Sequence, residues 1–119
     1  MAFVGIVEHN GIDLTVVDIS HCEPADSVRL LKQAIPLVKQ QPKSSVLLLT
    51  NVENTVYNKD VFPYIKDYVV SNIPFIKGSA VVGIDGMKKA IFNTLRFVTL
   101  HEIKQFKTEI EARDWLATL

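Results

Sequence analysis

Two short, unbroken apolar runs constrain the fold of this chain more than any other feature of its 119 residues. The first run is Val46–Leu49, inside a segment Ser45–Thr50 that we expect to be a strand. The second lies in Ser79–Ile84, where Ala80, Val81 and Val82 follow one another. Strands that are apolar on both faces are typical of parallel sheets covered by helices. The chain is therefore expected to be an α/β protein with two central parallel strands.

The first 19 residues predict a β-hairpin. Phe3–His9 and Ile12–Ile19 have strand-like composition, and the second alternates apolar and polar side chains over its first half. Between them lies Asn10–Gly11, the preferred pair for a two-residue type I′ turn, because both positions need a positive φ. The sheet should therefore contain one antiparallel strand at its beginning.

Helical patterns follow the hairpin and separate the later strands. Each begins with a residue suited to a helix start, either a proline in the first turn or a side chain that caps the first amides. Thr108–Glu111 has the pattern of a capping box. The expected helices begin near Glu23–Asp26, at Lys59 after Asn58, at Gly86 after Asp85, and at Thr108, with a short edge strand at Glu102–Lys107. This order is β-β-α-β-α-β-α-β-α, a mixed five-stranded sheet in a single domain over residues 1–119, with right-handed crossovers.

Composition excludes several classes of function. Lys and Arg total 13, as do Asp and Glu, so no concentrated basic surface for nucleic acid is expected. The lone Cys22 cannot form an internal disulfide, and no apolar run approaches the roughly 20 residues of a membrane span. Since the first residues also lack a secretory leader pattern, we expect a cytoplasmic protein.

The last third of the chain resembles a known family. Lys77–Gly83 reads KGSAVVG, and Ile103–Leu116 reads IKQFKTEIEARDWL, with the ending F-x-[ST]-x-x-E-A-x-x-W-L. This wording, together with the element order, resembles the SpoIIAA-like family of STAS-type domains. The resemblance implies a STAS-like fold, related to anti-sigma-factor antagonists and to CRAL-TRIO lipid-carrier domains, which are binding proteins and not enzymes.

The same resemblance raises a phosphorylation switch as an alternative. Anti-sigma-factor antagonists switch through a serine at the start of the helix after the central strand. The matching segment here is Asn51–Asn58, which lacks the usual Asp-Ser pair, and Tyr57 falls near the place of that serine. Thr55 lies close by. A phosphorylated regulator acting through Thr55 or Tyr57 is therefore a third hypothesis.

Large apolar side chains gather in the middle of the chain, and they suggest a binding site. One helix cannot bury all of them on a single face, so some should line a cavity or an association surface. We expect the contacts from Tyr57, Phe62, Tyr64, Phe75 and Ile76. The predicted function is a non-catalytic module that recognises a protein partner, itself in a homodimer, or an apolar, lipid-like ligand, without a cofactor.

The alternative is a small enzyme at the carboxyl edge of the sheet. Its candidates are Glu53, Asp85 and His21, because loops after parallel strands meet at that edge. Acidic residues there also serve as helix caps. Cys22 is a further candidate nucleophile, with His21 or His101 as base, but single cysteines are commonly buried and inert. No metal is expected, since adjacent residues of the run His21–Cys22–Glu23 point opposite ways in an extended segment and do not converge easily on one ion.

Overall fold

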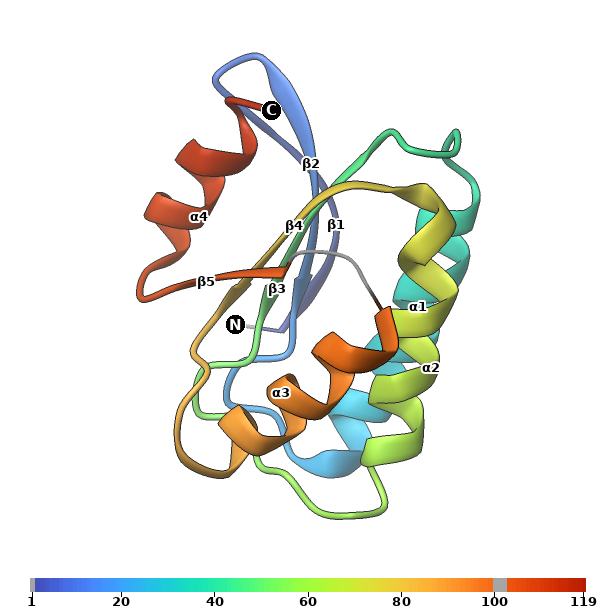
Figure 1. Ribbon diagram of the computed structural model, residues 1–119, viewed down its shortest axis with the longest axis vertical. Coiled ribbons are helices and arrows are strands. Elements are labelled where there is room, and N and C mark those ends of the chain that lie inside the picture. The colour runs from blue at the N-terminus through green and yellow to red at the C-terminus, as the bar shows by residue number, and fades with distance from the viewer. Residues whose placement is uncertain (1, 100–102) are drawn as a thin grey trace.

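A computed structural model, which describes residues 2–99 and 103–119, shows an α/β fold with a five-stranded mixed sheet and four α-helices (Figure 1). The strands and helices follow the order expected from the sequence. Their bounds are β1 Phe3–His9, β2 Ile12–Asp18, α1 Pro24–Lys39, β3 Val46–Asn51, α2 Phe62–Asn72, a 3-10 turn Ile73–Phe75, β4 Ile76–Val82, α3 Gly86–Thr99, β5 Ile103–Phe106 and α4 Glu109–Leu116.

The sheet is arranged in the order of the sequence, β1-β2-β3-β4-β5. β1 pairs antiparallel with β2, and each later strand pairs in parallel with the one before it. The hairpin turn follows its predicted chemistry, because Asn10 has a φ of 54° and Gly11 a φ of 78°. This conformation favours glycine and is tolerated by asparagine.

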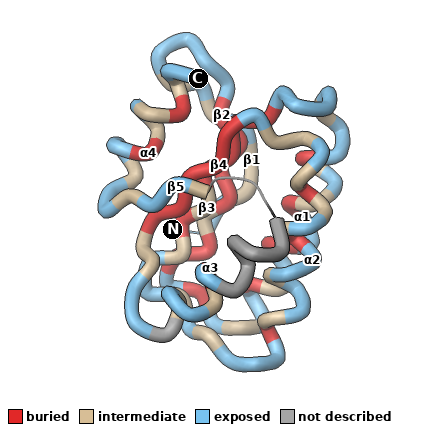
Figure 2. Tube along the Cα trace, in the orientation of Figure 1, coloured by how far each residue is buried: buried red, intermediate tan, exposed pale blue. Residues whose placement is uncertain are grey.

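Helices cover both faces of the sheet, but unevenly. Side chains of α1 and α2 pack with Val17, Val46 and Leu48 on one face, and α3 lies beside α2. α4 packs on the opposite face, where Ala112 and Leu116 meet Leu14, Val16, Leu47 and Leu49. Figure 2 shows the buried residues concentrated along the central strands. The two apolar runs lie in the central strands β3 and β4, where alternate side chains point into the two cores on opposite faces of the sheet.

Two elements begin three residues away from the expected position, each for a local reason. β4 starts at Ile76 and not Ser79, because Val46 of β3 already pairs with Ile76, and it stops before Gly83, whose φ is 91°. α2 begins at Phe62, while Asn58 accepts a hydrogen bond from the Val61 amide and closes the turn before the helix. α1 continues through Pro36, which lies on its exposed side.

Hydrogen bonds hold the C-terminal helix α4 at its first turn and near its end. The Thr108 hydroxyl accepts a hydrogen bond from the Glu111 amide and lies 2.7 Å from the Glu111 carboxylate, as a capping residue does. Further along, Asp114 lies 2.7 Å from Nε2 of His9, which joins α4 to β1. Among the described residues, no helix is long and apolar enough to span a membrane.

Candidate functional site

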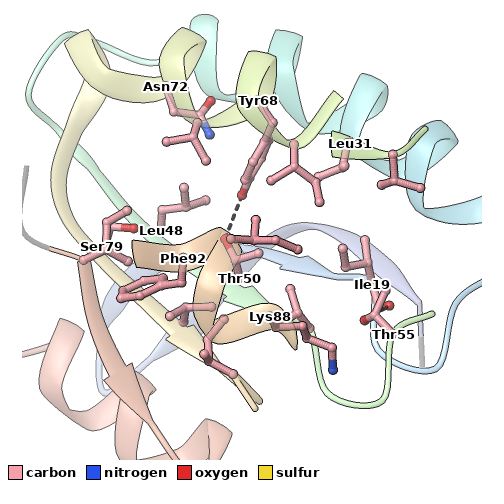
Figure 3. Close-up of a pocket in the computed structure, with 18 of the residues that line it drawn as sticks. Ile19, Leu31, Leu48, Thr50, Thr55, Tyr68, Asn72, Ser79, Lys88 and Phe92 are labelled. Carbon is pink, nitrogen blue, oxygen red and sulfur yellow. Dashed lines mark hydrogen bonds between the residues drawn. The ribbon is translucent and has the colours of Figure 1, made fainter. Parts of the chain in front are cut away.

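A cavity of about 130 Å³ lies between the sheet and the pair of helices α2 and α3 (Figure 3). Its floor is formed by side chains of β3 and β4 that point toward the helices, Leu48, Thr50, Ser79 and Val81. These four share one face because Leu48 pairs with Ser79 and Thr50 pairs with Val81. The site therefore follows from the register of the two apolar strands.

The walls of the cavity are almost wholly apolar. Every element on this face of the sheet contributes to it, together with the segment between β3 and α2. The described wall residues are Ile19, Leu31, Val52, Thr55, Val56, Tyr57, Val61, Ile65, Tyr68, Val69, Asn72, Ile73, Ile76, Ile84, Lys88, Ile91, Phe92 and Ile103. Such a surface binds apolar groups by removing them from water.

A hydrogen bond crosses the cavity from helix α2 to the sheet. The hydroxyl of Tyr68 lies 2.8 Å from Oγ1 of Thr50, as the dashed line in Figure 3 marks. Burial raises the pKa of Tyr68 above its ordinary value, and the nearby Thr50 and Asn72 side chains oppose that shift. Tyr68 therefore stays a neutral phenol.

Asn72 is the most unusual residue in the cavity wall. Its side chain comes from the same face of α2 as Tyr68 and is only 2% exposed (Figure 3). The side chain is near enough to the Tyr68 hydroxyl to lower the pKa of that group, but neither Oδ1 nor Nδ2 meets the distance and angle of a hydrogen bond to any partner in the described part of the chain. Buried amides are nearly always paired, so this side chain is an exception that needs an explanation.

Lys88 supplies the one cationic side chain among the described residues that line the cavity. Its side chain is 15% exposed, and its Nζ lies 3.4 Å from a carboxylate oxygen of Asp85. The stem of the lysine therefore contributes apolar surface to the wall while an acidic neighbour compensates its charge.

The five residues expected to make contacts are brought together only in part. Tyr57 and Ile76 line the cavity. Phe75 packs against the edge of the core beside it, and Phe62 is half-buried outside the lining. Tyr64 is exposed on the outer side of α2, where Nζ of Lys32 lies 5.1 Å from its ring centre.

The residues of the enzyme alternative lie in exposed loops at the carboxyl edge of the sheet. The backbone of His21 donates a hydrogen bond to the Glu53 carbonyl at 2.9 Å, so these two loops touch. The side chains of Glu53, His21 and Asp85 are all exposed. Within residues 2–99 and 103–119, no three His, Cys, Asp or Glu side chains gather as metal ligands would. His101 lies outside the described residues.

A second hollow opens at the same edge, and its lining is mixed. Its charged and polar side chains are all exposed to solvent. Its lining is Gly83, Ile84, Asp85, Lys89, Gln105, Phe106 and Lys107. It lacks the desolvated apolar wall that makes the first cavity suitable for a small molecule.

The two remaining candidates for chemistry are Cys22, which lies in the hydrophobic core, and Thr55, whose hydroxyl holds a loop in place. Cys22 is buried, and burial, followed by the negative charges of Asp26 and Asp18, raises the pKa of its thiol. A raised pKa leaves less of the reactive thiolate at neutral pH. The hydroxyl of Thr55 donates a hydrogen bond of 2.8 Å to the Ile19 carbonyl, which anchors the loop between β3 and α2.

Comparison with protein-family models, curated proteins and solved structures gives no match.

Sequence reasoning missed the two residues that give the cavity its character. Phe92 of α3 closes the cavity from the helix side, and Asn72 places an amide in it. A signal for Asn72 was present, because it extends the apolar stripe of α2 formed by Ile65, Tyr68 and Val69. A polar residue on the buried stripe of a helix is the kind of exception that marks a site.

Proposed function

We propose that this protein is a non-catalytic, STAS-like binding or regulatory module whose cavity takes a small, largely apolar molecule. The observation that carries the proposal is the apolar cavity of about 130 Å³ between the sheet and helices α2 and α3. Well-packed cores contain few voids larger than a water molecule, and an empty cavity of this size destabilises the folded protein unless a ligand fills it.

The dimensions of the cavity limit the ligand. An engineered apolar cavity of about 150 Å³ binds benzene and stays free of water. The present cavity is slightly smaller, so its ligand buries about six or seven heavy atoms, as a single ring or a short branched chain does. A longer lipid-like molecule would have to leave part of its length outside.

The chemistry of the wall supports binding over catalysis. Catalytic sites bring several ionisable groups within hydrogen-bond reach of one another. The described ionisable side chains of this wall are Tyr57, Tyr68 and Lys88, and they are respectively half-buried, bonded to Thr50 and paired with Asp85. The residues of the enzyme alternative face solvent instead.

The loop between β3 and α2 offers a route from occupancy to a partner protein. Val52, Thr55 and Tyr57 of this loop line the cavity, while Glu53 and Asn54 are exposed, as is 44% of Val56. A ligand that changes how this loop packs also changes the surface that a protein partner, or a second copy of the chain, would contact. The ligand would thus regulate the contact with a protein, so that both predicted kinds of partner, a protein and an apolar small molecule, act through the same loop.

The proposal is tested by titrating the protein with toluene and following amide chemical shifts by NMR. We expect saturable shifts of the cavity residues, with a dissociation constant in the millimolar range or below. Ser79→Leu fills the cavity from its floor and should abolish them. The matched control Ser71→Leu makes the same change outside the cavity lining, at a half-buried position whose hydroxyl donates a hydrogen bond to Asp67, and binding should persist. Equal, non-saturable shifts in all three proteins would contradict the proposal.

A further inference from the structure

The unpartnered amide of Asn72 indicates what the ligand of the cavity carries. Asn72 lines the cavity at the end of α2, and both polar atoms of its side chain are buried without a hydrogen-bond partner in the described residues. A buried amide that has lost its water and gained no partner destabilises the folded protein. A leucine at this position would complete the apolar stripe of the helix. The amide is therefore explained if a bound molecule supplies the missing partner.

We propose that the ligand is a small, uncharged molecule, aromatic or branched, with a single group that both donates and accepts a hydrogen bond, and that Asn72 binds this group. This inference rests on the proposed function of the cavity and adds the chemistry of its ligand. A carboxamide offers one acceptor at Oδ1 and two donor hydrogens at Nδ2. Its natural complement is a hydroxyl or a primary amide.

The surroundings of Asn72 favour a neutral group over an ionised one. The wall around it is apolar, and moving an isolated charge into such a place costs far more than moving a neutral polar group. The cation of Lys88 does not change this balance, because Asp85 lies 3.4 Å from it. A carboxylate ligand would have to compete with that carboxylate.

The pair of hydroxyls next to Asn72 extends the polar spot. Tyr68 lies one turn before Asn72 on α2 and lies 2.8 Å from Thr50 through its hydroxyl. One hydrogen bond between two hydroxyls uses one of their two protons, so a proton is left for an acceptor on the ligand. Thr50, Tyr68 and Asn72 thus form one polar spot in an apolar wall, and this arrangement orients a ligand that has one polar end.

Phenol and toluene test the inference because they have the same size and shape and differ only in a hydroxyl for a methyl group. An apolar cavity without a polar partner discriminates against phenol, since its hydroxyl loses water and gains nothing. In the unmodified protein, phenol should bind at least as tightly as toluene. In Asn72→Leu, the ratio of the phenol to the toluene dissociation constant should rise by about tenfold or more. Asn72→Ala, which leaves the space open, should show the same change in preference.

The outcomes separate this inference from the proposed function. If toluene binds in a way that Ser79→Leu blocks, but the phenol-to-toluene ratio is the same in the unmodified protein and both Asn72 variants, the assignment of Asn72 is wrong and the cavity remains a binding site. If neither probe binds the unmodified protein, the proposed function itself fails. A ratio that rises in both variants while toluene binding persists supports the inference.

Discussion

Replacing Asn72 by leucine should make this protein more stable, which is the opposite of what most substitutions of buried residues do. The two side chains have the same branching at Cγ, and leucine puts methyl groups where Oδ1 and Nδ2 now lie. Neither amide atom has a hydrogen-bond partner among the described residues, so the substitution removes no hydrogen bond. It also extends the apolar stripe of α2 into the cavity.

The magnitude follows from the cost of an unsatisfied buried amide. Leaving such a group without a partner costs about 1–3 kcal/mol. Asn72 is 2% exposed, so water at the protein surface does not offset this cost. We therefore expect the free energy of unfolding of Asn72→Leu to rise by about 1–3 kcal/mol, and for a domain of this size the melting temperature should rise by about 4 °C per kcal/mol.

Asn51 provides a matched control. It is also buried, at 8% exposure, but its Oδ1 accepts a hydrogen bond of 2.9 Å from the Glu53 amide. Asn51→Leu breaks this bond and leaves that amide unpaired, so it should lower the free energy of unfolding by about 1–3 kcal/mol. Urea unfolding of ligand-free protein, followed by circular dichroism, measures both changes.

Opposite signs for the two asparagines are the result that the structure requires. If Asn72→Leu destabilises the ligand-free protein as much as Asn51→Leu does, the amide of Asn72 has a structural partner, and the reasoning that assigns it to a ligand is refuted.

Three further results follow from the structure. Gly83→Ala should lower the free energy of unfolding by about 2–4 kcal/mol in urea titrations, since the φ of 91° disfavours a side chain and the new Cβ would lie 2.5 Å from the backbone of Glu53. The control Gly11→Ala, where the new Cβ meets open space, should lower it by only about 1 kcal/mol. Cys22 should react slowly with a disulfide reagent at pH 7.5 and rapidly in urea, because burial raises its pKa; equal rates in both conditions would show an accessible thiolate. Burial raises the pKa of Tyr68 in the folded protein, so the unfolded state loses the phenol proton at a lower pH than the folded state does. The free energy of unfolding should therefore be unaffected by this group below about pH 10 and should fall as the pH rises further. Tyr68→Phe should reduce that fall in urea unfolding measured between about pH 9 and 11.

Local chemistry made much of the fold predictable from the sequence. The pair Asn10–Gly11 determined the hairpin, Thr108 and Glu111 marked the start of the last helix, and the two apolar runs identified the central parallel strands. Each of these signals acts over a few neighbouring residues. The predicted start of α2 after Asn58 was three residues too early, because an asparagine can close a turn as well as cap a helix.

The cavity could not be predicted because it depends on packing between distant segments. Leu48, Tyr68 and Phe92 meet across it, yet more than 40 residues separate the first from the last. Among the aromatic residues of the middle segment, periodicity alone did not distinguish Tyr57, which lines the cavity, from Tyr64, which lies on the outer side of α2. The orphan amide of Asn72 likewise becomes visible only when its neighbours are known.

A crystal exposed to xenon tests the central claim most directly, because xenon enters apolar cavities of this size without chemical bias. The structure predicts a xenon atom between Leu48, Tyr68 and Phe92, and its loss in crystals of Ser79→Leu. Xenon absent from this space in the unmodified protein, or retained there in Ser79→Leu, would contradict the claim that the protein holds a small apolar molecule between its sheet and helices α2 and α3.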